Sequence, residues 1–419
     1  MTSPHRTPGR GRRVALWVVV AAAAVIQCIV LASVFPFAAL LGIQALSVFP
    51  SSGGAPKAIA SADVSGTGPG SLVSATTMPG LTRTFHGRPL EAARVLYRST
   101  EGDNGQPTVV SGSVFIPRGN PPPGGWPVVA FAHGTTGING ECGPSLSDTL
   151  RTLVVAARLL TGKGYAVALP DYQGLGAKGV HPYPDSRTAG LNMIDAVRAL
   201  RHTFPNISDR WAAVGDSQGG GASWAADEQA GDYAPELHLV GAVATSPASD
   251  VSGLADKAVR GELTDDQRPV LQLIVETLAR LHPDVSRDDF RKGAAVQYWD
   301  VLSACIGPKA YQRGSVIKKL GPTDIGPQNP QAADQLRTLL TGWALPQKPL
   351  SAPLSVWYGA KDTFIDAEWT TAALKKACAS GGVITIELDP NKGHSQADIN
   401  KQLSWVADRF AGKPPADDC

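Results

Sequence analysis

The segment Gly215-Asp216-Ser217-Gln218-Gly219 is the only match to the pattern G-x-S-x-G in the chain. The pattern alone is weak evidence, because 45 glycines among 419 residues make a chance match common. Its surroundings are more specific: the apolar run Trp211–Val214 precedes it, and the small-residue segment Gly219–Ala226 follows. A strand, a tight turn and a helix in this order form a nucleophile elbow, which exposes the serine hydroxyl at the sheet edge. The segment therefore predicts that Ser217 is a catalytic nucleophile.

Short apolar runs alternate with segments of helical spacing on both sides of this motif. The sequence predicts strands at Val128–Ala132, Tyr165–Leu169, Trp211–Val214, Leu239–Ala244, Leu354–Tyr358 and Val383–Leu388. It predicts helices at Leu150–Leu160, Leu191–Leu200, Glu368–Cys378 and Ile399–Phe410. An antiparallel hairpin, Val95–Tyr97 and Val109–Ile116, precedes them. This alternation predicts an α/β fold with a mostly parallel sheet flanked by helices.

Residues 250–349 interrupt the alternation. They hold little strand signal and carry apolar side chains at helical spacing between Val270 and Leu281. Ser286 and Asn329 have the surroundings of helix N-caps. We therefore expect a helical cap inserted into one α/β domain, which residues 81–249 and 350–419 form. Residues 50–80 are rich in Ser, Gly, Pro and Ala, which indicates a linker.

The N-terminus has the pattern of an export segment. Residues 1–13 form a basic leader with four arginines and no acid, and residues 14–34 are almost wholly apolar. The apolar run is long enough to span a bilayer, which favours a signal anchor. Val30-Leu31-Ala32 and Ala45-Leu46-Ser47 also fit cleavage of a signal peptide. Either alternative places the body outside the cytoplasm, and an uncleaved segment would contact the membrane.

Charge and cysteine content exclude several classes of partner. Without the four leader arginines the formal net charge falls from +2 to −2, and no basic run interleaved with aromatics is present. Nucleic acid is therefore not an expected partner. Cys142, Cys305, Cys378 and Cys419 are an even number in an oxidising compartment, which indicates disulfides, and their spacing allows three pairings. No metal is expected, because no C-x-x-C or similar ligand spacing occurs.

A serine nucleophile needs a general base, and the base needs an orienting carboxylate. After an elbow of this kind the base follows the last strand, where His394 lies. Asp362 follows the strand before it and is the predicted acid. Asp366 lies where a helix starts and is better explained as an N-cap. The other histidines, such as His181, are expected to be solvated or at the edge of the core. The order Ser217, Asp362, His394 is that of α/β hydrolases.

Acyl transfer also needs donors for the developing oxyanion. We predict the backbone N–H of Gln218 as one, and that of Thr135, with Gly134 as the alternative, as the other. The predicted pocket lining is His133, Gly134, Asp171 and Tyr172. The segment Gly174–Gly179 matches the dinucleotide-binding pattern G-x-G-x-x-G, but the prolines that follow prevent a helix from opening there. Nucleotide binding is therefore not expected.

Together these residues resemble the secretory lipase family of α/β hydrolases, which includes the fungal lipase A type. The resemblance covers about residues 75–415 and rests on His133–Gly137, Pro170–Gly174, Gly215–Gly219, Asp362 and Gly393-His394. It implies a lipase or esterase that acts on a small-molecule ester or lipid, with a helical cap and no cofactor. It also implies the disulfides Cys142–Cys305 and Cys378–Cys419.

Two other classes of function remain open from the sequence. An acyltransferase or a peptidase uses the same triad, because all of them form an acyl-enzyme. A non-catalytic interaction module on the hydrolase fold is the other, because a fold does not determine a function. Product analysis distinguishes the first class from an ester hydrolase, and labelling with a fluorophosphonate distinguishes the second.

Overall fold

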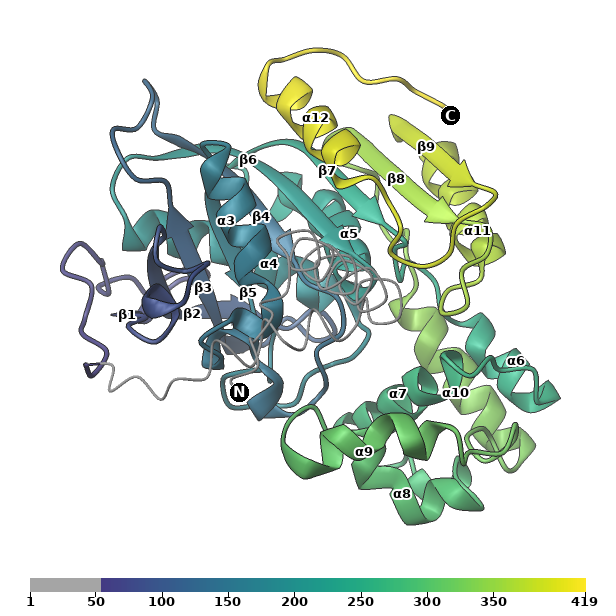
Figure 1. Cartoon of the computed structure of the whole chain (residues 1–419). Helices are drawn as coiled ribbons and strands as arrows, with labels where there is room; N and C mark the ends of the chain where they lie inside the picture. Colours follow the sequence, from purple (N-terminus) through teal and green to yellow (C-terminus); the bar gives the residue numbers. More distant parts are fainter. Residues whose placement is uncertain (1–53) are drawn as a thin grey trace, which may run out of the picture. The chain divides into compact units, whose positions relative to one another are not determined.

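A nine-stranded sheet lies at the centre of residues 54–419, the part of the chain that the computed structural model describes (Figure 1). Its strand order is β1-β2-β3-β5-β4-β6-β7-β8-β9. The strands β5, β4, β6, β7, β8 and β9 are parallel to one another, and β1, β2 and β3 add an antiparallel end. Their bounds are β1 Leu72–Thr77, β2 Glu91–Thr100, β3 Pro107–Ile116, β4 Trp126–Ala132, β5 Ala166–Pro170, β6 Ile207–Asp216, β7 His238–Thr245, β8 Leu354–Gly359 and β9 Ile384–Asp389. The prediction of a mostly parallel sheet is confirmed.

Helices cover both faces of the sheet, because successive side chains of a strand point to opposite faces. In β4, Val128 and Ala130 are buried in the core that α4, α5 and α11 complete. Val129, between them, is buried in a second core that α3 and α12 complete. The bounds of these helices are α3 Val154–Gly162, α4 Ser186–Thr203, α5 Gln218–Tyr233, α11 Ala367–Ala379 and α12 Ile399–Phe410. The predicted layers of helix, sheet and helix are confirmed.

Between β7 and β8 the chain forms a group of helices with its own apolar core. These helices are α6 Gly253–Arg260, α7 Gln267–Leu281, α8 Ala294–Leu302, α9 Gly307–Ile317 and α10 Pro330–Trp343. The apolar stripe of α7 is buried, as at Leu271 and Ile274. Asn329 caps α10 by accepting from Ala332 N at 2.8 Å, as its position before Pro330 predicts. We call this group, which lies at the lower right of Figure 1, the cap.

The prediction of a linker over residues 50–80 is wrong for its second half. Residues 72–77 form β1, which pairs antiparallel with β2. The backbone at Ile59 also hydrogen-bonds to Ala75 on β1. The small residues of this strand give little strand signal in the sequence, so it is not predicted. In the structure, Leu72 and Ala75 are buried against the core.

None of the helices in residues 54–419 is long and apolar enough to cross a bilayer. The predicted leader, residues 1–13, and the apolar segment, residues 14–34, lie outside the described residues. Whether that segment is a signal peptide or an anchor stays a prediction.

Candidate active site

The turn between β6 and α5 holds Ser217 in a strained backbone conformation. Its φ and ψ are 58° and −118°, and α5 begins at the next residue. A Cβ atom on Gly215 would lie 2.0 Å from the carbonyl oxygen of Gly219. A Cβ atom on Gly219 would lie 2.0 Å from the carbonyl oxygen of Ala132, at the end of β4. Because neither position has room for a side chain, both glycines of the motif are required to close this turn.

Three side chains from the carboxyl ends of β6, β8 and β9 form a hydrogen-bonded chain. The Nε2 atom of His394 lies 2.9 Å from Ser217 Oγ, and its Nδ1 atom lies 2.7 Å from Asp362 Oδ2. The other oxygen of Asp362 accepts from the backbone N–H groups of Phe364 and Ile365 at 2.8 and 3.0 Å. The side chain of Asp362 is only 2% exposed, which holds the carboxylate in one orientation. The structure thus brings the three predicted triad residues together.

Two backbone segments border the nucleophile where an oxyanion would form. Gln218 is the first residue of α5, so its N–H has no acceptor within the helix. The loop after β4 passes on the other side: a Cβ atom on Gly134 would lie 3.8 Å from Ser217 Cβ. Next to it, Thr135 fixes its hydroxyl against Tyr183 Oη at 2.9 Å. Gly134 and Thr135 both line the cavity that contains Ser217, and the choice between their N–H groups stays a prediction.

A cavity of about 330 Å³ lies between the triad and the cap. Its apolar side comes from cap helices and the loop after β8, with Leu254, Val270, Leu273, Ile274, Phe364 and Ile365 in the lining. Ser217 and His394 lie at its polar end. A cavity with an apolar wall beside a serine hydroxyl has room for a ligand that carries an apolar group.

A model of the secretory lipase family matches residues 146–418, about two thirds of the chain. The chain belongs to the secretory lipase family. A Mycobacterium tuberculosis protein called a probable inactive lipase is 25% identical, over 79% of this chain and 76% of that protein. Lipase 6 of Candida albicans is 26% identical, over 78% of this chain and 74% of the relative. The closed state of Candida antarctica lipase A matches with a TM-score of 0.67 at 17% identity, over 84% of each chain. That likeness shows the α/β-hydrolase fold.

Three of the residues predicted to line the pocket of this secretory lipase family member lie beneath it instead. His133, Asp171 and Tyr172 are buried and are not in the cavity lining. Asp171 accepts from Ser111 Oγ at 2.6 Å and Ser145 N at 2.8 Å, and its burial raises its pKa. The Tyr172 hydroxyl donates to the carbonyl oxygen of His133 at 2.9 Å. These side chains therefore support the loop that carries Gly134 and Thr135, because buried polar groups must find partners inside the protein.

The prediction that His181 is solvated or at the edge of the core is wrong. Its ring is buried, and burial lowers its pKa to about 3, so it is neutral. Its Nδ1 lies 2.9 Å from the carbonyl oxygen of Gln173, and its Nε2 lies 2.9 Å from the side-chain nitrogen of Gln218. With a proton on Nδ1 the ring donates to the carbonyl and accepts from the amide. His181 thus fixes the side chain of the predicted oxyanion donor, a role that no local pattern indicates.

Asp366 occupies the N-cap position of α11, but its carboxylate makes no hydrogen bond to that helix. It accepts instead from Lys257 Nζ at 2.8 Å and from Gln267 Nε2 at 2.7 Å. The prediction that its side chain caps the helix is therefore wrong. A cation on α6 attracts the carboxylate more strongly than the helix N-terminus does, and it joins the cap to the α/β domain.

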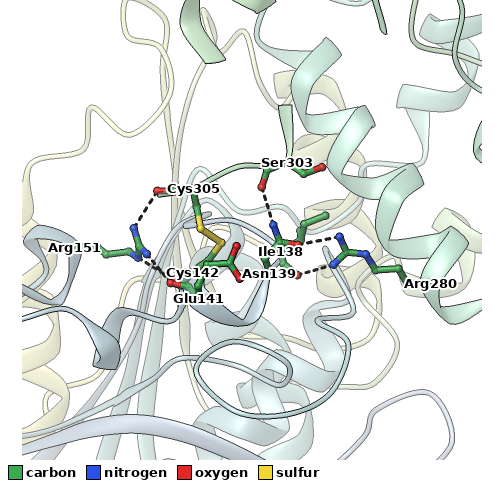
Figure 2. Close-up of a disulfide and its surroundings, with 8 residues drawn as sticks. All are labelled: Ile138, Asn139, Glu141, Cys142, Arg151, Arg280, Ser303 and Cys305. Carbon is green, nitrogen blue, oxygen red and sulfur yellow. Dashed lines mark hydrogen bonds between the residues drawn. A yellow bond between two sulfur atoms is a disulfide. The ribbon is translucent and has the colours of Figure 1, made fainter. Parts of the chain in front are cut away.

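The cysteines of the described residues form the two disulfides that the family resemblance implies. Cys142–Cys305 joins the loop after β4 to the cap, and Cys378–Cys419 joins α11 to the C-terminal tail. Arg151 donates to the backbone oxygens of both cysteines of the first disulfide (Figure 2). Glu141 lies beside this disulfide, but its sulfurs are bonded to each other, so the group offers no thiolate to a metal.

The glycine-rich segment Gly174–Gly179 does not open a helix. The next helix, α4, begins at Ser186, and the Asp185 carboxylate accepts from the first backbone N–H groups of that helix. An acidic side chain therefore occupies the position where a dinucleotide-binding helix would hold a phosphate.

Proposed function

We propose that this member of the secretory lipase family is an exported hydrolase of carboxylic esters that acts through an acyl-enzyme on Ser217. The observation that carries the proposal is the chain of contacts from Ser217 Oγ through His394 to Asp362, at 2.9 and 2.7 Å. A serine hydroxyl is a weak nucleophile until an adjacent base accepts its proton, and this geometry supplies that base.

In this mechanism Ser217 Oγ attacks the ester carbonyl carbon while its proton passes to His394 Nε2. Asp362 accepts from Nδ1 and stabilises the imidazolium. The N–H of Gln218 and that of Thr135 or Gly134 donate to the oxyanion of the tetrahedral intermediate. His394 then protonates the departing alkoxide, and the acyl group stays on Ser217. Water, deprotonated by the same histidine, attacks the acyl-enzyme and releases the carboxylic acid.

Two features support export. The family is one of secretory lipases. The chain also forms two disulfides, and disulfides form and persist in the oxidising compartments outside the cytoplasm. The basic leader and apolar residues 14–34 fit the same interpretation, with cleavage or retention of the segment as the remaining alternatives.

The decisive test is the Ser217→Ala variant, assayed on p-nitrophenyl esters of increasing acyl length and with a fluorophosphonate probe. We expect kcat to fall by up to about 10⁶-fold, because no acyl-enzyme can form without the Ser217 hydroxyl. Labelling should disappear as well, because the probe reacts with the same oxygen. Ser208→Ala, near the start of β6 and remote from the turn, is the control and should keep both. A wild-type protein that takes no label would support a non-catalytic role and contradict the proposal. Acyl transfer to an added alcohol in preference to water would identify an acyltransferase.

A further inference from the structure

One cation lines the catalytic cavity without a partner for its charge. Arg313 lies on α9 of the cap and borders the same cavity as Ser217 and His394. Its Nε atom is buried, with no hydrogen-bond partner among the described residues. None of the ion pairs within residues 54–419 includes its guanidinium group. Burial lowers the pKa of Arg313, although nearby Tyr183 acts in the opposite direction.

The acids of the cavity lining do not serve as that partner. Asp216 accepts from Thr245 Oγ1 at 2.7 Å and from Ser395 Oγ at 2.5 Å. Asp266 accepts from Thr363 Oγ1 at 2.7 Å. Each carboxylate is therefore held by hydroxyl groups, and neither pairs with the arginine. Within the described lining, the positive charge of Arg313 faces the cavity uncompensated.

A charge in this position is costly unless something binds to it. A guanidinium group cannot escape the cost by losing its proton, because its pKa is too high. Arg313 as a whole is only partly buried, and the atom without solvent or a partner is its Nε. Partial removal of an unpaired charge from water is unfavourable, and a bound anion offsets that penalty. The five N–H groups of arginine also match the two oxygens of a carboxylate.

We propose that Arg313 is a specificity-determining residue that binds a carboxylate carried by the substrate. The substrate class is then an amphiphilic ester: an apolar part that packs on the cap, the ester bond at Ser217, and a free carboxylate at Arg313. This inference rests on the proposed ester hydrolysis and narrows its substrate.

The test compares esters with isosteres that differ only in charge. In the first pair, monomethyl adipate carries the carboxylate on the acyl half, and its primary amide replaces that carboxylate with a neutral group. In the second pair, 4-(butyryloxy)benzoate carries it on the alcohol half, against 4-(butyryloxy)benzamide. We expect the wild-type kcat/KM to favour the anionic member of one pair by about 10- to 100-fold, the range of a charge-assisted hydrogen bond. The pair that responds identifies the half that Arg313 binds.

The variants separate recognition from folding. Arg313→Gln should abolish the preference for the anionic ester. Arg313→Lys should retain part of that preference, because lysine keeps the positive charge but cannot donate two parallel hydrogen bonds to a carboxylate. The preference is the ratio of kcat/KM for the anionic ester to kcat/KM for the neutral ester in the same protein. A variant that is less active on every ester therefore keeps the same ratio. Lys309→Gln is the matched control, since that exposed lysine lies on the same helix, pairs with Asp300 at 3.6 Å and does not line the cavity. It should keep the wild-type ratio.

Two results would overturn the inference. One is equal kcat/KM for the members of both pairs in the wild-type protein, and the other is an unchanged ratio in Arg313→Gln. In both cases hydrolysis of the neutral esters would leave the proposed function intact. If no ester of either pair were hydrolysed, the proposed function would fail, and with it the inference. Calorimetry on Ser217→Ala gives an independent measurement, in which the anionic ester should bind about 10-fold more tightly than its amide.

Discussion

Asp362 and Asp366 lie four residues apart on one loop, yet their carboxylates serve different groups. Asp362 faces His394 Nδ1 at 2.7 Å, and Asp366 faces the ammonium group of Lys257 at 2.8 Å. The Asp366 ion pair is partly buried, with side chains about one fifth exposed or less. An Asp→Asn substitution at each position can therefore distinguish the proposed catalytic role of Asp362 from the structural role of Asp366.

We expect Asp362→Asn to fold and to lose about 10⁴-fold in kcat, because an amide no longer holds the imidazole in the tautomer that accepts the serine proton. Asp366→Asn should keep kcat within a few-fold and lose about 1–2 kcal/mol of stability, because Lys257 loses its anion. Steady-state rates and thermal unfolding of both variants measure these effects. Loss of activity in Asp366→Asn alone would move the triad acid to that position.

At the residue scale, the sequence predicts roles that depend on neighbours along the chain. Ser217 follows a strand and precedes a helix, and His394 follows the last strand, so their positions are readable from local patterns. The role of His181 depends on a side chain 37 residues away, and that of Asp366 on one 109 residues away. Contacts of that range depend on the packed fold, and no pattern along the chain contains them.

At the scale of elements, apolar content decided which segments could be predicted. The central parallel strands β5 and β8 are buried along their whole length and consist mostly of apolar residues, which makes them easy to predict from the sequence. Strand β1, at the antiparallel edge, contains Ser and Thr beside its apolar residues without a regular alternation, and the glycines and prolines around it resemble those of a linker. The pairing of β1 with β2 is set by tertiary contacts, which override local composition.

The two disulfides connect elements of different importance to the site. Cys142–Cys305 joins the loop beside Ser217 to the cap across 163 residues of sequence, and Cys378–Cys419 closes 41 residues. Around the first, Arg280 donates to Ile138 O and to Asn139 Oδ1, which adds a second connection between loop and cap (Figure 2).

Replacing both cysteines of a disulfide by serine should therefore have unequal effects. The chain-entropy model assigns about 5 kcal/mol to the longer loop and about 4 kcal/mol to the shorter one. We expect the Cys142→Ser, Cys305→Ser variant also to lose kcat/KM on esters, because the predicted oxyanion loop would become more mobile. The Cys378→Ser, Cys419→Ser variant should lose stability but keep its kcat/KM on esters. Urea unfolding and ester assays measure both, and equal loss of activity in the two variants would contradict the assignment.

At the scale of the whole molecule, the sheet places every group of the proposed mechanism at one edge. Ser217 follows β6, Asp362 follows β8, His394 follows β9, and the predicted oxyanion loop follows β4. Parallel strands bring their carboxyl ends to the same side, so four distant segments of sequence meet there. The cap leaves the sheet from that same edge, between β7 and β8, and covers the apolar side of the cavity.

The return from the cap to β8 is held by two buried acids on α5. Asp227 and Glu228 accept hydrogen bonds from backbone N–H groups within residues 347–352. Burial raises the pKa of Asp227 to about 8 and that of Glu228 to about 7. Unfolded carboxylic acids ionise near pH 4, so between pH 4 and 8 the folded protein binds more protons than the unfolded chain. Stability must then decrease as pH rises through this window.

We therefore expect the free energy of unfolding to decrease by about 1–3 kcal/mol between pH 6.5 and 8. Burial lowers the pKa of His133 and His181, which has the opposite effect, but only below about pH 6.5, where the unfolded histidines become charged. Urea unfolding across this range measures the slope. Asp227→Asn should flatten it and stabilise the protein at pH 8, because the amide keeps an acceptor for Ser351 and carries no charge. A stability that rises with pH above 6.5, or a slope unchanged in Asp227→Asn, would show that the buried acid is ionised in the folded protein.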